Sequence, residues 1–197
     1  MIITAGVIPA MIGCHHETPP SPPKTVQAAK FPENSAGRTT ELAALSSQIQ
    51  RLLEQLPGGT ADEHRSIVAD LLGNFSKALR LPQGNRLTPE FQSQVAVIDH
   101  ARWVLSQPDV PRERVSALEN EAARSILASA EDLAASRMTG DEKLKAIIES
   151  ARSSVDTMFS TTGAMHDLDA SAGFRTLGKI VQRISDDMNQ RIAQSPS

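Results

Sequence analysis

The sequence predicts an all-α protein, an antiparallel bundle of about five to six helices that follows a disordered N-terminal tether. Aromatic residues make up only 3% of the 197 residues, with one Trp and no Tyr, whereas strands favour aromatic and β-branched side chains. From residue 38 onward, apolar residues recur every three or four positions, which is the helical period. Short segments rich in Pro and Gly separate these stretches, and short connections make neighbouring helices run in opposite directions.

The first predicted helix covers residues 40–56 and ends at Pro57-Gly58-Gly59. Thr60 and Glu63 match the capping box, in which a hydroxyl and a carboxylate each satisfy an unpaired backbone N–H, so a second helix starts here. Pro82 and Gly84 predict a loop over residues 81–87. The narrow apolar seam of the first helix consists of Leu42, Leu45, Ile49, Leu52 and Leu56. The inward residues of the second are Ile67, Val68, Leu71, Leu72, Phe75 and Leu79.

Four further helices follow by the same signals. Thr88-Pro89 provides an N-cap and a Pro in the first helical position, and Pro111 begins an Ala-rich helix that runs to about residue 138. Thr139-Gly140-Asp141-Glu142 matches the capping box of a fifth helix that ends near Gly163. The last helix covers residues 170–193. The expected buried residues are Phe91, Val95, Ile98, Leu105, Val115, Leu118, Ala122, Ile126, Ala130, Leu133, Leu144, Ile147, Ile148, Ala151, Val155, Met158, Phe159, Phe174, Leu177, Val181, Ile184, Met188 and Ile192.

The N-terminal segment has a different character. Residues 1–13 carry no charge but are fewer than the roughly 20 residues that a spanning helix needs. They end in Met11-Ile12-Gly13-Cys14, which resembles the bacterial lipobox, with an apolar residue three positions before the Cys and a small residue directly before it. The resemblance implies cleavage before Cys14 and a diacylglycerol on its thiol. The alternatives are an uncleaved anchor segment, or a first core element in which Cys14 is a small buried residue.

Three parts follow from this interpretation: a signal-like segment over residues 1–13, a lipidated Cys and tether over 14–37, and the bundle over 38–197. Residues 15–37 contain five prolines and few apolar residues, a composition that favours an extended tether. The expected location is the bacterial cell envelope, facing the periplasm. By analogy with enteric lipoproteins, His15 in place of Asp mildly favours the outer membrane.

Charge and cysteine content exclude several kinds of protein. The net charge is -3 and the 20 basic residues form no run, so a nucleic-acid partner is not expected. A single Cys excludes an intrachain disulfide framework and sites built from several cysteines. The sequence also lacks the G-x-S-x-G, H-E-x-x-H, E-x-x-H and C-x-x-C-H motifs of common hydrolase, metal and haem sites.

The histidines are the first candidates for ligands. His15 and His16 could bind a metal with Cys14 if its thiol stayed free. His64 lies on the apolar face of the second helix, where we expect a helix-start residue half covered by a neighbour. His100 lies about 200° from the inward stripe of its helix and is expected at the solvated surface.

A second cluster, His166, Asp167 and Asp169, is expected in the loop between the fifth and sixth helices. Its imidazole and carboxylates could hold a divalent cation, although the same residues are ordinary in loops and caps. The adjacent carboxylate pairs Glu131-Asp132, Asp141-Glu142 and Asp186-Asp187 point about 100° apart on a helix and are expected to be solvated. The only Trp, Trp103, could anchor a partner, but packing against a neighbouring helix is the favoured expectation.

The resulting hypothesis is a lipid-anchored binding or scaffolding module, without enzymatic activity or cofactor, that meets a protein partner through a face of its first or last helix. The alternative is that the apolar seams of the first and last helices are both buried inside the bundle and are not available to a partner. A rival class is a bundle that binds b-type haem or a metal in the periplasm, and a third is an enzyme with residues from several helices. The available haem ligands are His64 or His166 with Met138, Met158, Met165 or Met188.

Overall fold

The computed structural model describes residues 35–84 and 87–194, and these ranges contain six α-helices, one short 3-10 helix and no strand. The all-α prediction is therefore confirmed. The signal-like segment, Cys14, His15 and His16 lie outside the described residues. The elements are α1 (Ser35–Gln55), η1 (Leu56–Gly58), α2 (Ala61–Gln83), α3 (Pro89–Leu105), α4 (Arg112–Arg137), α5 (Glu142–Phe159) and α6 (Gly163–Gln194).

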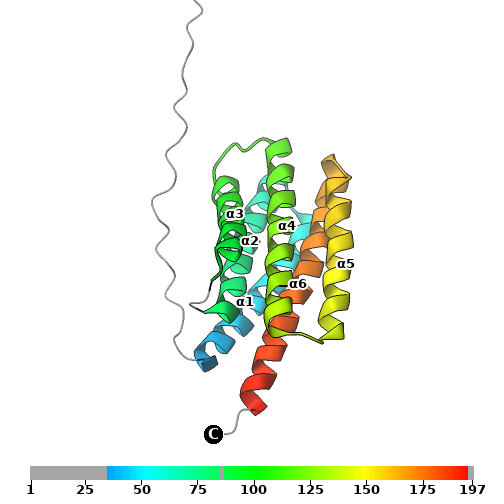
Figure 1. Cartoon of the computed structure of the whole chain (residues 1–197). Coiled ribbons are helices and arrows are strands. Elements are labelled where there is room, and N and C mark those ends of the chain that lie inside the picture. The colour runs from blue at the N-terminus through cyan, green and yellow to red at the C-terminus, as the bar shows by residue number, and fades with distance from the viewer. Residues whose placement is uncertain (1–34, 85–86, 195–197) are drawn as a thin grey trace, which may run out of the picture. The chain divides into compact units, whose positions relative to one another are not determined.

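The six helices form a bundle with three inner and three outer members (Figure 1). Helices α2, α4 and α6 contact one another. Helix α1 packs against α2 and α6, α3 against α2 and α4, and α5 against α4 and α6. Because successive helices are antiparallel, the three inner helices all begin at the same end of the bundle, which is the upper end in Figure 1. Within the described ranges, no helix is both long and apolar enough to cross a bilayer.

The helical apolar period predicts most of the core correctly. The rings of Phe75 and Phe174, 6.4 Å apart, join α2 to α6 at its centre, and both residues are fully buried. Two predicted core residues lie at the surface instead, since Phe159 is 38% and Ile192 37% exposed. Each lies close to the end of its helix, where fewer neighbours are available to cover it. The guanidinium of Arg124 lies 3.3 Å from the centre of the Phe159 ring and covers part of it.

The helix starts follow local capping chemistry. The Glu63 N–H donates to the Thr60 hydroxyl at 3.3 Å, and the Thr60 N–H donates to the Glu63 carboxylate at 2.7 Å, so the capping box of α2 is confirmed. The predicted box at residues 139–142 is wrong, because Asp141 caps α5 by accepting from the Leu144 N–H at 3.0 Å. Gly140, with a φ of 88°, turns the chain directly before this cap.

Three boundaries differ from the predictions. Helix α1 begins at Ser35, ahead of residue 40. Helix α2 continues through Pro82 to Gln83, although a loop was expected from residue 81. Pro82 lies in the last turn of α2, where it removes one hydrogen-bond donor, and its side chain is buried. Helix α6 begins at Gly163, a residue expected to end the fifth helix, and so includes more than a turn of chain ahead of residue 170.

A glycine allows two helices to approach closely. A Cβ atom on Gly178 of α6 would lie 2.7 Å from the Leu53 Cδ1 atom of α1, closer than such contacts occur. Gly178 therefore allows α6 to pack closely on α1, although Gly lowers the helix propensity of α6 by about 1 kcal/mol relative to Ala.

Replacing Gly178 with a large side chain should destabilise the protein. For Gly178→Leu, overpacking against α1 should lower the free energy of unfolding by about 1–3 kcal/mol, despite the better helix propensity of Leu. Urea unfolding followed by circular dichroism measures the change. Ala172→Leu, at an exposed position of the same helix, is the control and should stay within about 0.5 kcal/mol of the wild type. Equal stability of the two variants would contradict the close contact.

Candidate functional site

Glu119 is a carboxylate inside the apolar core. It lies on α4 and is 0% exposed, beside the buried residues Leu118 and Ala122. The sequence interpretation did not single out Glu119, although a signal was present. The residue continues the apolar stripe of its helix, four positions after Val115 and three before Ala122. An acidic residue in such a stripe must find donors inside the protein, because a buried charge without partners is strongly destabilising.

Two histidines supply these donors. The Nε2 atom of His64 lies 2.8 Å from Oε1 of Glu119, and the Nε2 atom of His166 lies 3.0 Å from Oε2. His64 is 8% and His166 0% exposed. The three residues come from α2, α4 and α6, so each inner helix contributes one member. We call this set the His–Glu–His cluster.

The first turns of two helices position the histidines. The His64 N–H donates to the carbonyl of the N-cap residue Thr60 at 2.8 Å, which places His64 in the first turn of α2. His166 lies in the first turn of α6. A positive charge in the first turn of a helix opposes the helix dipole. The Glu119 carboxylate between the two rings compensates for this unfavourable placement.

The other ring nitrogen of His166 also has a partner. Its Nδ1 atom lies 3.1 Å from the backbone carbonyl oxygen of Met158, in the last turn of α5. A carbonyl oxygen only accepts hydrogen bonds, so Nδ1 carries the proton in this contact. His166 therefore ties the end of α5 and the start of α6 to Glu119 on α4.

The cluster shifts the proton affinities of all three members. Burial favours the neutral form of His64, but the hydrogen bond and the charge of Glu119 outweigh it and raise the pKa of His64. The hydrogen bond to Glu119 likewise raises the pKa of His166, against the effect of burial. Burial acts to raise the pKa of Glu119, but the hydrogen bonds from His166 and His64 lower it below its ordinary value. The ionised carboxylate paired with imidazolium is thus the favoured form.

A small pocket lies beside His64, at the end of the bundle where α2 and α4 begin. Its volume is about 70 Å³, far below the roughly 300–1,000 Å³ of ordinary small-molecule sites. An ion pair between Arg112 and Asp167, 2.6 Å apart, forms one wall. Arg65 forms another, and it donates to the carbonyl oxygens of Leu105 and Gln107. The lining residues are Ala61, Asp62, His64, Arg65, Val110, Arg112, Val115, Ser116 and Asp167.

The possible cation site at His166, Asp167 and Asp169 is not formed. All three residues lie on α6 and not in a loop. His166 points to Glu119, and Asp167 pairs with Arg112 on α4. Across residues 35–84 and 87–194, no group of three or more His, Cys, Asp or Glu side chains is placed to hold a metal ion.

The methionines considered as haem ligands are spread over the bundle. The Met158 side chain is buried and would contact a Cβ atom at position 173 of α6. Met138 is 7% exposed, Met188 is partly buried against the core, and Met165 is 59% exposed. Both His64 and His166 direct Nε2 to Glu119, so neither of these nitrogens faces a methionine sulfur.

Two further sequence expectations are resolved at the surface of α3. His100 is exposed, as predicted. Trp103 is 44% exposed, so the expectation that it packs against a neighbouring helix is wrong. Its ring lies 6.3 Å from the ring of His100, one turn earlier on the same helix.

The expectation of solvated carboxylates fails at Asp141, the N-cap of α5. Its carboxylate pairs with Arg183 at 2.7 Å, and its side chain is 13% exposed.

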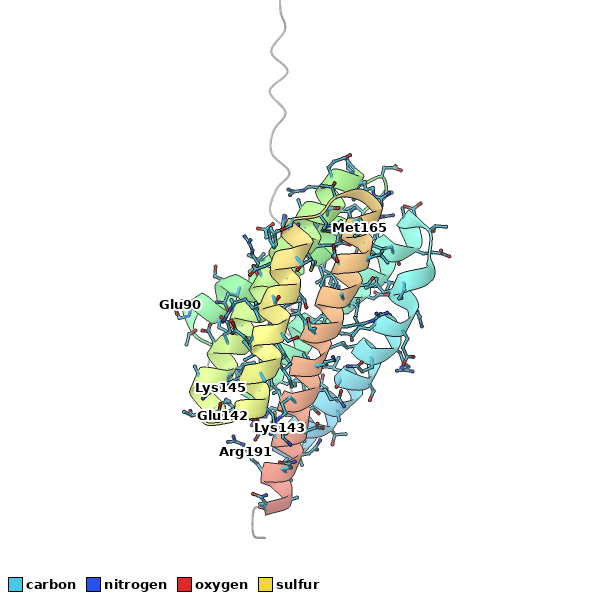
Figure 2. The ribbon with its side chains drawn as sticks, turned by 90° about the vertical axis from the view of Figure 1, so that its right-hand side faces the viewer. Glu90, Glu142, Lys143, Lys145, Met165 and Arg191 are labelled. Carbon is cyan, nitrogen blue, oxygen red and sulfur yellow. The ribbon has the colours of Figure 1, made fainter. Side chains whose placement is uncertain are left out.

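The start of α6 carries two large exposed apolar side chains, Met165 and Leu168, at 59% and 60% exposure. Residues three apart on a helix share a face. Met165 lies at the end of the bundle opposite Glu142 and Arg191 (Figure 2). Met165 and Leu168 therefore lie at the end of the bundle where the inner helices begin, which is also the end that carries His64 and His166.

Comparisons with models of protein families, with curated proteins and with solved structures give no match for this chain.

Removing the charge of Glu119 should destabilise the bundle. Glu119→Gln keeps the shape of the side chain but weakens two charge-assisted hydrogen bonds, each worth about 1.5–3 kcal/mol. We expect the free energy of unfolding near pH 6 to fall by about 3 kcal/mol, measured in urea. Glu121→Gln removes the same charge from an exposed position of α4 and should have little effect. Equal effects of the two substitutions would contradict the importance of the cluster.

Proposed function

We propose that this protein is a lipid-anchored module of the bacterial cell envelope that acts by binding or scaffolding and not by catalysis. The observation that supports a non-catalytic role is that the most strongly buried ionisable side chains use their hydrogen-bonding groups on one another. Both carboxylate oxygens of Glu119 accept hydrogen bonds from buried histidines. A catalytic acid or base needs to reach a substrate, and the pocket beside His64 is only about 70 Å³ in volume.

The anchor part of the proposal rests on the sequence before the bundle. Met11-Ile12-Gly13-Cys14 resembles a lipobox, and the Pro-rich residues 15–34 precede α1, which begins at Ser35. Two or three acyl chains at Cys14 would give durable attachment, because each buried methylene contributes about 0.8 kcal/mol. The lipid would keep the bundle close to a membrane, and the outer membrane is the one that we favour.

The partner surface that we favour is the face of α6 with Met165 and Leu168. The seam of α1 does not serve this purpose, because Leu42, Leu45 and Ile49 are buried inside the bundle. Met is enriched in protein–protein interfaces, and neighbouring exposed apolar side chains lose unfavourable contact with water when a partner covers them. Partner recruitment would therefore take place at the end of the bundle where the inner helices begin.

The haem alternative has less support from the same residues. Axial ligation would require the Nε2 atom of a histidine to leave Glu119, which would then stay buried with one donor fewer. Such a buried carboxylate is strongly destabilising. The scaffolding interpretation requires no such rearrangement.

Loss of the Cys14 thiol should release the protein from membranes. Expressed in a bacterial host from its genomic start, the wild type should appear in the membrane fraction as a species that begins at Cys14 and carries acyl chains, measured by intact mass. Cys14→Ser should be soluble and unacylated. The double variant Cys14→Ser, Ser21→Cys is the control, because it restores a thiol in the tether but outside the lipobox, and it should also be soluble. Unchanged membrane association of Cys14→Ser would contradict the anchor.

A photo-crosslinking amino acid in place of Leu168 should capture a specific envelope protein in whole cells. The same amino acid at Glu90, an exposed position on α3 that lies away from Met165 on the side of the bundle (Figure 2), is the control. Gel electrophoresis should show a discrete adduct for position 168 and none for position 90. No adduct at position 168, or identical adducts at both positions, would contradict this partner surface.

A further inference from the structure

The contacts of His166 set a minimum number of protons for the His–Glu–His cluster. Nδ1 of His166 faces the carbonyl oxygen of Met158, and Nε2 faces Oε2 of Glu119. An ionised carboxylate and two neutral imidazoles together carry two of these protons, one on each ring. Both contacts of His166 are hydrogen bonds only if the cluster holds one proton more than that. This count is the same whichever atom of the Nε2···Oε2 pair carries that proton.

Loss of this proton breaks one of two contacts. If neutral His166 keeps its proton on Nε2, the lone pair of Nδ1 faces the Met158 carbonyl oxygen. If it keeps the proton on Nδ1, the lone pair of Nε2 faces the ionised Glu119. Either arrangement places two acceptors about 3 Å apart inside the protein, where unsatisfied polar groups are costly.

The broken contact would lie at the connection between α5 and α6. Met158 lies in the last turn of α5 and His166 in the first turn of α6, so their hydrogen bond closes the short connection between the two helices. The Glu119 contact fastens this connection to α4. Exposed side chains flank it, including Leu168 and Phe159.

We propose that the His–Glu–His cluster is a proton-operated latch, which fastens the α5–α6 connection to α2 and α4 when the shared proton is bound and loosens it when that proton is lost. The proposal rests on hydrogen-bond geometry and is independent of lipid anchoring and of the partner surface. It assigns a regulatory role to three buried side chains that otherwise only stabilise the bundle.

The charged groups around the latch come from each inner helix. Asp62 and Arg65 of α2, Arg112 of α4 and Asp167 of α6 line the pocket beside His64. Arg112 and Asp167 pair with each other, and so do Arg65 and Asp62. The partner that α5 provides is the Met158 carbonyl oxygen. Glu119 therefore remains the carboxylate in direct contact with both histidines.

The sign of the pH effect follows from the direction of each shift. The pKa values of both histidines are raised, so their contribution to stability is complete below the ordinary histidine value of 6.5 and is lost as the pH rises through the raised values. The pKa of Glu119 is lowered from 4.5, so its contribution is complete above that value and is lost as the pH falls through the lowered one. The latch is therefore closed in mildly acidic solution and opens on the alkaline side.

Hydrogen exchange measured on the full-length chain at about pH 6 and about pH 9 tests the latch, with rates corrected for intrinsic exchange. Amides of residues 158–160 and 167–170, which donate the backbone hydrogen bonds at the end of α5 and the start of α6, should lose protection at the higher pH relative to the centre of α2. The loss should be about tenfold for each unit by which the pKa of His166 is raised. His166→Gln cannot titrate and should show no such change between the two conditions. His100→Gln, which replaces an exposed histidine, is the matched control and should behave like the wild type.

A second measurement applies if His166→Gln does not fold. The ¹⁵N shifts of the histidine rings in the wild-type protein report directly which nitrogens carry protons. At about pH 6 both nitrogens of His166 should be protonated, and they should lose a proton over the same pH range in which protection falls. A neutral His166 beside an ionised Glu119 at about pH 6, or protection of residues 158–160 and 167–170 that does not change with pH, would overturn the proposal.

Discussion

The burial of one carboxylate determines how this bundle is assembled. Glu119 lies at a core position of α4 with no exposed surface, and a charge in this environment is tolerated only when hydrogen bonds replace its lost hydration. The two donors come from positions 55 and 47 residues away in the sequence. Any arrangement that leaves either histidine out of reach is penalised, so the cluster favours one relative placement of α2, α4 and α6 over the others that apolar packing alone would permit.

The same requirement explains several local features. Helix α6 begins at Gly163, and this places His166 in its first turn, where Nε2 reaches Glu119 and Nδ1 reaches the end of α5. Two histidines in the first turns of parallel inner helices would be unfavourable beside the helix dipoles without a negative charge between them. The ion pair of Arg112 and Asp167 forms one wall of the small pocket beside His64. Buried electrostatics and helix boundaries are thus coupled in this fold.

The function that we propose depends on which side chains are buried and which are exposed. The histidines and Glu119 of the His–Glu–His cluster are buried and hydrogen-bond to one another, while the exposed apolar side chains Met165 and Leu168 lie at the start of α6. The lipobox-like segment would hold this bundle near a membrane without requiring its helices to enter the lipid. A latch between the end of α5 and the start of α6 would act on the connection directly before these side chains, so that proton binding and partner binding could be coupled through one short segment.

The sequence by itself determined which segments are helical and, for the most part, which faces they bury, because the apolar period and the caps at Thr60 and Thr88 are local signals. Tertiary structure decided the continuation of α2 through Pro82, the early start of α6 and the exposure of Phe159. Above all, it decided that His64, Glu119 and His166 meet. The position of Glu119 in the apolar stripe of α4 was a signal of a buried acid that the sequence analysis did not use, and the donors that stabilise it lie on other helices. Only packing between helices brings such distant groups within hydrogen-bond distance, and local propensity contains no information about it.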